Sequence, residues 1–227
     1  MILIFKEISS STYGLKVKKR PPIPKAERSI EKIEVPGRHG FLTVDNGNFK
    51  GISIPVEFLF TGQDVATTAR QIKQWLIGSG NLSFSDDPSV YYKASVFNAF
   101  DIESAIKNFG EFQVIFDCQP FAYEINSGII MLEQAVTIYN TGYESEPYIK
   151  VTGSGNITLN INSKNIILTN VVDYIEIDSE MMNCFKGAQN CNNQMQGEFP
   201  ILVTGNNEIS WTGTVIKVEI TPRWRWL

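Results

Sequence analysis

The chain has 227 residues, 43% of them hydrophobic and 19% charged, so it can bury a substantial core and is not compositionally disordered. Its formal charge of −4 argues against a protein that coats nucleic acid through its overall field. The single histidine excludes most chemistry that needs imidazole bases or ligands, and three cysteines without CxxC spacing predict neither a zinc site nor a disulfide framework.

The first 40 residues are basic. The opening apolar run, residues 1–5, is too short for a signal peptide, and because no later run approaches ~18 apolar residues we expect no membrane span. Nine Lys and Arg and four Glu give residues 1–40 a charge of +5, which leaves −9 for the remainder. The proline-bearing stretch over 18–40 is expected to be an exposed excursion between strands. This charge split can favour head-to-tail association of copies, although a solvated basic arm is the simpler explanation.

Alternating hydrophobic residues predict strands over 52–60, 90–97 and 112–118. Pro55 would place the first of these at a sheet edge or a bulge, because proline donates no ladder hydrogen bond. Asp64 can cap a helix in which apolar residues recur at spacings of 4, 3 and 4, and glycines follow where that helix would end. We therefore predict one amphipathic helix over about residues 64–77, lying against the first sheet.

The second half consists almost entirely of strand and turn signals. Alternation over 155–169, around the turn residues 162–165, predicts a hairpin. Further strands are expected over 171–179, 200–203, 208–211 and 214–220. Short strands at this spacing are typical of an antiparallel sandwich. The predicted fold class is therefore mainly β, with a β-barrel or sandwich carrying one helix over 1–132 and an antiparallel β-sandwich over 133–227.

Few residues suggest catalysis or metal binding. On a strand, Glu176, Asp178 and Glu180 would share one face and could supply a glycosidase-like carboxylate pair or a calcium site, but a solvated strand face explains the same residues. His39 lies in a glycine-rich turn without a nucleophile motif. The cysteines at 184 and 191 are interpreted as incidental thiols. We therefore assign no catalytic residue, metal ligand or cofactor.

Aromatic residues in the second half offer an alternative function. Trp211, Trp224 and Trp226, with Tyr174, could form a stacking platform for sugar on a β-sandwich. The same side chains could instead close the base of the sandwich or form an interface, which is the simpler interpretation. Under the sugar-binding alternative, the candidate contacts are Trp211 and Tyr174.

The succession of short segments along the chain carries a resemblance to a known family. In the C-terminal half these segments are Ile177-Asp-Ser-Glu180, Gly197-Glu-Phe-Pro200, Gly205-Asn-Asn207 and Pro222-Arg-Trp-Arg225. In the N-terminal half they are Val35-Pro-Gly-Arg38, Leu82-Ser-Phe84 and Pro120-Phe-Ala-Tyr123. This order resembles the distal tail protein family of siphophages, the long-tailed phages, of Gram-positive bacteria. The resemblance covers nearly the whole chain and rests on order and spacing rather than on any single motif.

The resemblance implies a structural protein of the virion tail tip, synthesised in the cytoplasm of the bacterial host. Family members form a hexameric ring, which a tail-tube-like N-terminal domain builds and from which a galectin-like β-sandwich points outward. The ring joins the tail-tube protein to the tail-associated fibre or lysin protein and often anchors receptor-binding or baseplate proteins. The expected partners are these proteins and further copies of the chain, without sequence-specific nucleic acid or a membrane. The inserted sugar-binding module or long arm of some members has no room in this chain.

A closed ring needs a heterologous interface, in which one face of each copy meets a different face of the next. We therefore expect the basic segment to meet the acidic remainder of a neighbouring copy, which would aid encounter and register more than affinity. The candidate inter-subunit contacts are Lys16, Lys18, Lys19, Arg20, Lys25, Arg28 and Arg38. The alternatives are a carbohydrate-binding module acting through the C-terminal sandwich and a hydrolase that uses the carboxylates of residues 173–180.

Overall fold

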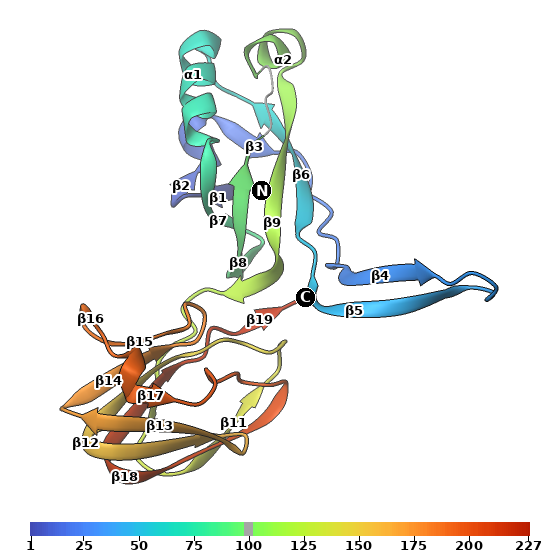
Figure 1. The fold of residues 1–227 in the computed structure, drawn as a ribbon. Coiled ribbons are helices and arrows are strands. Elements are labelled where there is room, and N and C mark those ends of the chain that lie inside the picture. Colours follow the sequence, from blue (N-terminus) through green and yellow to red (C-terminus); the bar gives the residue numbers. More distant parts are fainter. Residues whose placement is uncertain (98–101) are drawn as a thin grey trace. The chain divides into compact units, whose positions relative to one another are not determined.

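The structure is a computed structural model that describes residues 1–97 and 102–227, and its contacts divide the chain into two units, Met1–Ile125 and Asn126–Trp226 (Figure 1). Both units consist mainly of antiparallel sheets, which confirms the predicted fold class. The division lies before the boundary expected after residue 132. Strand β10 (Ile130–Leu132) pairs with β18 (Gly205–Thr221) and therefore belongs to the second unit.

One curled antiparallel sheet forms the first unit. Its strands, in sheet order, are β2 (Ile8–Ser9), β1 (Leu3–Phe5), β7 (Gly78–Phe84), β8 (Asp87–Val96), β9 (Glu111–Glu124), β6 (Ile52–Phe60) and β3 (Leu15–Val17). A short 3-10 helix, η1 (Ser10–Tyr13), connects β2 to β3. The backbone N–H of Val17 donates to the carbonyl of Met1 at 3.1 Å, so the curl brings β3 beside the start of β1. Pro55 lies where β6 pairs with β9 but not with β3, as expected for an edge position.

The predicted helix is confirmed as α1 (Val65–Trp75). The Asp64 carboxylate accepts a hydrogen bond from the Thr67 backbone N–H at 3.2 Å and so caps the first turn. The buried residues of α1 are Ala69, Ile72 and Trp75. Their spacing of three places one apolar stripe against the sheet, because residues three or four apart share a helix face.

A second helix, α2 (Ile102–Phe109), was not predicted from the sequence. Ile102 and Ile106 are buried one turn apart, and Gly110 follows in the left-handed region with φ +68°. Two turns present too few apolar positions to separate a helical period from a short buried strand. The described part of the first unit therefore contains two α-helices rather than one.

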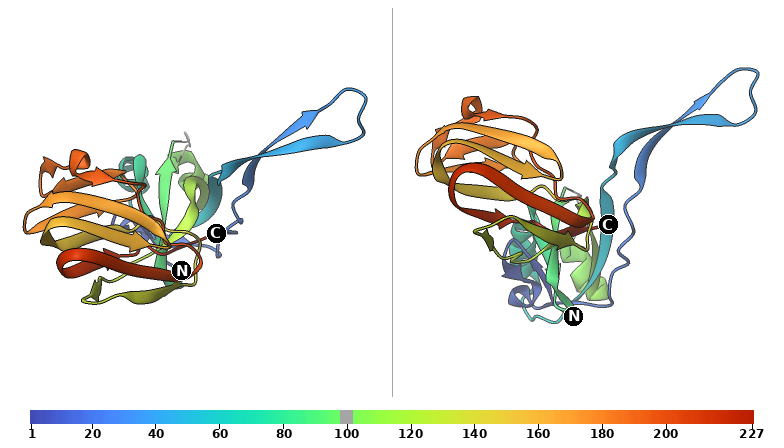
Figure 2. Two further views of the ribbon diagram at one scale, coloured as in Figure 1. Left: turned by 60° about the horizontal axis from the view of Figure 1, so that its bottom comes forward. Right: turned by 90° about the horizontal axis from the view of Figure 1, so that it is seen from below.

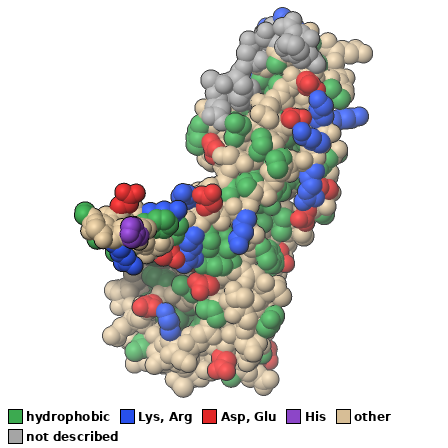
Figure 3. Space-filling model, turned by 90° about the vertical axis from the view of Figure 1, so that its right-hand side faces the viewer, with side chains coloured by type: hydrophobic (Ala, Val, Ile, Leu, Met, Phe, Trp, Pro, Cys, Tyr) green, Lys and Arg blue, Asp and Glu red, His purple; other side chains and the backbone are tan. Residues whose placement is uncertain are grey.

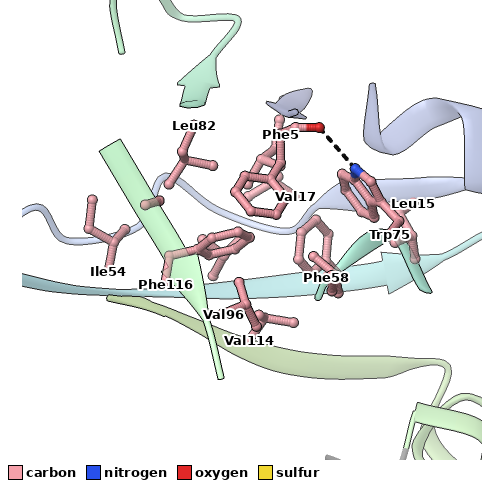
Figure 4. Packing of buried hydrophobic residues seen from close by; sticks show 14 of the residues in the cluster. Phe5, Leu15, Val17, Ile54, Phe58, Trp75, Leu82, Val96, Val114 and Phe116 are labelled. Carbon is pink, nitrogen blue, oxygen red and sulfur yellow. Dashed lines mark hydrogen bonds between the residues drawn. The ribbon is translucent and has the colours of Figure 1, made fainter. Parts of the chain in front are cut away.

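The core of the first unit is built around aromatic side chains (Figure 4). Phe5, Phe58 and Phe116 are fully buried, and the rings of Phe5 and Phe116 meet edge to face with centroids 5.3 Å apart. The indole N–H of Trp75 donates to the carbonyl of Phe5 at 2.9 Å. This hydrogen bond satisfies the polar atom of the largest side chain that α1 buries, and it fixes α1 against β1.

Residues 28–49 form a separate two-stranded hairpin, β4 (Arg28–Glu34) and β5 (Phe41–Phe49). Both views in Figure 2 show this hairpin reaching away from the sheet of its own unit. The expected exposed excursion is therefore exposed, but it is regular β structure over most of its length.

The second unit is a two-layered antiparallel structure. Its remaining elements are β11 (Val136–Asn140), β12 (Tyr148–Ile161), β13 (Lys164–Val171), β14 (Tyr174–Asp178), β15 (Asn183–Lys186), β16 (Gln189–Asn190), η2 (Asn192–Gln194), β17 (Met195–Gln196) and β19 (Arg225–Trp226). One layer has the order β10-β18-β12-β14-β15-β16, and the other joins β11, β18, β12, β13 and β17. The hairpin predicted over 155–169 is confirmed, with Ile161 paired to Lys164 across a tight turn.

The long strands β12 and β18 contribute to both layers because they bend together at glycines. Their register shifts on both sides of the Gly153–Ser154 pair. A Cβ at Gly153 would lie 2.3 Å from the carbonyl oxygen of Thr214, and one at Gly213, where φ is +100°, would lie 2.5 Å from that of Asn156. Only glycine allows the two backbones to approach this closely. Among the described residues, no helix is long and apolar enough to cross a membrane.

Candidate assembly surface

The β4–β5 hairpin has two different faces, because paired residues of an antiparallel ladder project to the same side. Ile33 pairs with Leu42, and Glu31 pairs with Val44, so these four side chains share one face. Val35 continues the alternation beyond the end of β4. We call Ile33, Val35, Leu42 and Val44 the apolar hairpin face. They are 40%, 37%, 41% and 43% exposed, respectively, so a large part of each side chain still contacts water.

The opposite face of the hairpin is mixed and internally paired. The Arg28 guanidinium binds the Asp45 carboxylate through Nε at 2.8 and 3.1 Å. The pKa of Asp45 lies below its usual value, because the Gly47 N–H and then Arg28 donate hydrogen bonds to the carboxylate. The Lys32 ammonium lies 4.6 Å from the centroid of the Phe41 ring. Arg28, Lys32 and Asp45 therefore have partners within the hairpin.

The base of the hairpin is tied to the sheet. The Phe49 ring packs edge to face on Phe121 with centroids 5.9 Å apart, and Arg28 lies 5.0 Å above the Phe49 ring. The Lys50 N–H donates to the carbonyl of Glu27 at 2.9 Å. These contacts hold the residue pairs at the base of the hairpin. Among the described residues, the pairs farther from the base contact mainly one another. An isolated two-stranded hairpin is marginally stable in water, so this arm gains most from a covering partner.

Several of the predicted inter-subunit contacts already have partners within the chain. Lys18 Nζ lies 2.6 Å from Glu111, Lys19 Nζ lies 3.3 Å from Glu57, and Arg20 binds Asp86. The hydrogen bond to Glu111, followed by its charge, raises the pKa of Lys18. Figure 3 shows Lys and Arg side chains interspersed with Asp and Glu on the face turned to the viewer.

The other predicted basic contacts differ in their surroundings. Lys16 is exposed on β3 opposite Leu59, Lys25 is exposed before β4, and Arg38 is exposed in the turn between β4 and β5. Among the side chains that the structure describes, no carboxylate lies within 4.0 Å of the charged groups of these three residues. Arg28 is paired to Asp45. The structure thus leaves Lys16, Lys25 and Arg38 as the predicted contacts available to a partner.

Sequence reasoning missed the apolar hairpin face. Its signal is present in the sequence as the alternating residues Ile33 and Val35 and, on the second strand, Leu42 and Val44. The surrounding charges and prolines concealed the strand period, and Ile30 and Phe41 on the opposite face interrupt the alternation.

The two candidate sugar contacts do not form one platform. Trp211 lies on the same side of β18 as Ile209, which is buried, and it packs against the core of the second unit. Tyr174 alternates with the buried Ile175 and therefore projects away from that core. The ammonium groups of Lys150 and Lys186 lie 4.1 and 5.1 Å from the centroid of the Tyr174 ring. Trp224 also packs against the core.

The carboxylates of residues 173–180 are engaged in hydrogen bonds within their own unit. Glu176 accepts from the Tyr148 hydroxyl and from the Gly187 N–H. Asp178 accepts both Arg223 NH groups, at 2.7 and 2.8 Å. Burial alone would raise the pKa of Asp178, but the Arg223 hydrogen bond and the Met181 N–H outweigh it and leave the pKa below its ordinary value.

These bonds stabilise the charged form of Asp178 and leave it no proton to donate near neutral pH. No group of three or more His, Cys, Asp or Glu side chains in the described residues could hold a metal ion. Asp178 is therefore unsuited to be the acid of a glycosidase pair.

Residues 8–118, which include the curled sheet and the hairpin, match the family model of the phage tail protein RIFT-related domain. This part of the chain therefore carries a phage tail domain, and the chain is similar to phage tail proteins. Its fold over the whole length is that of a distal tail hub protein. The crystal structure of SPP1 Dit (gp 19.1), described as a paradigm of the hub adsorption apparatus in phages that infect Gram-positive bacteria, matches with a TM-score of 0.76 at 16% identity.

The match covers 100% of this chain and 99% of SPP1 Dit, so both units and their order are shared. No curated protein sequence matches the chain. The resemblance to the distal tail protein family is therefore confirmed by the tail domain and by the fold.

Proposed function

We propose that the chain is a structural protein of a virion tail tip and forms a hexameric, ring-shaped hub. The whole-length likeness to the SPP1 Dit hub carries this proposal, together with the phage tail domain over residues 8–118. The ring joins the tail-tube protein to the tail-associated fibre or lysin protein, and receptor-binding or baseplate proteins attach to it. The chain is synthesised in the host cytoplasm and acts without catalysis, cofactor or sequence-specific nucleic-acid contacts.

The hairpin supplies the contact between neighbouring copies in this proposal. A heterologous ring requires one projecting surface that meets a different surface of the next copy. The apolar hairpin face is a projecting surface of the first unit, with Ile33, Leu42 and Val44 each about two-fifths exposed. Burial of these side chains would supply affinity, because transfer of apolar surface from water is the main favourable contribution to association.

Charge plays a smaller part than the composition of residues 1–40 predicts. Lys18, Lys19 and Arg20 are already paired with carboxylates of their own unit. A new partner would have to replace those ion pairs, and exchanging one exposed pair for another gives little free energy. The proposed charged contacts between copies are therefore Lys16, Lys25 and Arg38, which set the register of the hairpin against the next copy.

The carbohydrate-binding alternative is not favoured. Trp211 and Tyr174 project to opposite sides of their sheet, and Lys150 and Lys186 cover the Tyr174 ring. A sugar-stacking platform needs an open aromatic face, which neither residue offers in this arrangement.

The mass in solution tests the hub proposal. Light scattering behind size-exclusion chromatography is expected to give a species of six 25.5 kDa chains, about 153 kDa, for the full chain alone or mixed with its tail-tube protein. Negative-stain images of that species should show a closed ring. A monomer that neither closes into a ring nor binds the tail-tube protein would refute the proposal. Dissociation of the ring at high salt would indicate that the charged contacts contribute to assembly. A ring that is stable at high salt would indicate that the apolar hairpin face is the main contact.

A further inference from the structure

Two of the three cysteines face each other across a hairpin of the second unit. Strands β15 and β16 pair Phe185 with Asn190 and Lys186 with Gln189. Continuing this antiparallel register by one residue places Cys184 directly opposite Cys191. The Cys191 N–H donates to the Cys184 carbonyl at 2.8 Å, which confirms that the two residues are neighbours across the ladder.

Both thiols point to the same side of this hairpin. Cys184 is 0% exposed and Cys191 is 4% exposed, and both belong to the buried core of the second unit. Burial raises the pKa of Cys184 to about 11, and the nearby Cys191 adds to this rise. The residues between them, from Gly187 to Asn190, are exposed. Both cysteine side chains therefore lie in the core beneath a solvent-exposed hairpin turn, where the Cys191 thiol donates to the Gln189 carbonyl at 3.6 Å.

The backbone geometry suits a disulfide. The two cysteines share one ladder hydrogen bond, because the Cys184 N–H donates instead to the Asn192 side-chain oxygen at 2.6 Å. Residues that lie opposite each other in an antiparallel pair have Cα atoms about 4.5–5.5 Å apart. Disulfides span Cα separations of about 4.4–6.8 Å, so this position falls within the allowed range. Cys118 differs in this respect, because it lies alone on β9 of the first unit. Its pKa is raised to about 12, first by burial and then by the Asp117 charge.

We propose that Cys184 and Cys191 are a redox-sensitive pair that closes to a cross-strand disulfide when the protein meets a small-molecule disulfide such as oxidised glutathione. The thiolate of one cysteine attacks the glutathione disulfide and forms a mixed disulfide, which releases one glutathione thiolate. The second cysteine then attacks the mixed disulfide and releases the other. The two protein thiols give up their protons to the leaving glutathiones, so the products are one protein disulfide and two reduced glutathiones.

The closed disulfide would pin an edge of the second unit. β16 is the last strand of its layer and pairs only with β15, so the exposed turn over residues 187–190 lies at an edge of the second unit. Opening of this short hairpin gives the oxidant access to thiols that are otherwise buried. The expectation that the disulfide forms when the protein leaves the reducing cytoplasm depends on the proposed role in a virion. The pairing of Cys184 with Cys191 depends only on the strand register.

Peptide mapping of the full chain tests the pair. The reduced protein is incubated with oxidised glutathione, in native buffer and in urea below the unfolding transition, then alkylated and digested with trypsin. Trypsin cuts after Lys186, between the two cysteines, so closure joins the peptide over 165–186 to the peptide over 187–217. We expect this joined species, two hydrogens lighter than its separate parts, and its loss on treatment with dithiothreitol. The number of titratable thiols in the unfolded protein should fall from three to one.

Two variants provide the controls. Cys118→Ala should form the same joined peptides, with thiols falling from two to none. Cys191→Ala should form none and should retain a thiol or a glutathione adduct at Cys184. Glutathione adducts on separate cysteines of the parent protein, or free thiols alone in both buffers, would overturn the proposal. A protein that forms the disulfide but no ring would leave the pair standing and count only against the hub proposal, so the two failures are distinguishable.

Discussion

Replacement of Ile33 by threonine tests the apolar hairpin face against a control on the same hairpin. Ile33 is 40% exposed on the apolar face, and Ile30 is 42% exposed on the opposite face, where it pairs with Asp45. Threonine keeps the β-branched side chain that suits a strand, so the hairpin itself should persist in both variants. The two substitutions therefore change the same chemistry at equal exposure and differ only in the face that they alter.

The expected loss follows from the exposed fraction. Full burial of an isoleucine side chain is worth about 3 kcal/mol, so covering the exposed two-fifths contributes about 1 kcal/mol per interface. Ile33→Thr should therefore weaken each interface about fivefold, and Ile33→Thr combined with Val44→Thr about thirtyfold. Because a closed ring repeats the interface in every copy, the loss recurs around the ring.

Analytical ultracentrifugation over a concentration series measures the effect. The concentration at which the ring dissociates should rise for Ile33→Thr and rise further for the double variant, and it should stay unchanged for Ile30→Thr. Urea unfolding should move by no more than about 0.5 kcal/mol in each case, because these side chains are exposed in the separate chain. Equal weakening by Ile30→Thr and Ile33→Thr, or no weakening by the double variant, would refute docking through the apolar hairpin face.

Three further predictions concern stability, each measured by urea unfolding of the full chain. Gly153→Ala should cost about 2 kcal/mol or more, because its Cβ would lie 2.3 Å from the Thr214 carbonyl; an unchanged midpoint would show that β12 and β18 can separate there. Trp75→Phe should cost about 1–3 kcal/mol through the lost hydrogen bond to Phe5, and a neutral result would contradict that bond. Asp178→Asn should lower the free energy of unfolding near neutral pH. Because the folded pKa of Asp178 is depressed, the parent should keep its full extra stability above pH ~5 and lose it as the pH falls through the folded pKa. A stability difference that does not change with pH would exclude the ionisation of Asp178 as its cause.

The sequence by itself determined the elements whose periodic pattern is long or whose turn chemistry is local. The cap at Asp64 and the apolar spacing that follows it specify α1, and the alternation from Ile52 to Phe60 specifies β6. The Asn162-Ser163 turn specifies the hairpin of β12 and β13, because its two positive φ angles suit asparagine and match the twist of paired strands. The order of segments also indicated the phage tail family, which the comparisons confirmed.

Only the tertiary structure decided which residues are available to a partner. Lys18, Lys19 and Arg20 appear in the sequence as part of one basic run, yet their carboxylate partners come from β9, β6 and the β7–β8 turn, far along the chain. Trp211 and Tyr174 likewise appear as two aromatic residues, and only strand pairing shows that they face opposite sides of a sheet. Composition gives the numbers of charged and aromatic side chains, whereas strand pairing between distant parts of the chain determines which of these side chains are in contact.

The same physical reason explains two further features that the sequence analysis missed. The hairpin of β4 and β5 shows a weak period because it has an apolar face without a core of its own, and burial is what normally makes a strand pattern distinct. Cys184 and Cys191, seven residues apart, become opposite neighbours only through the register of β15 and β16. Local patterns therefore specified the elements of this protein, and the register between its strands specified the surfaces and pairs that those elements form.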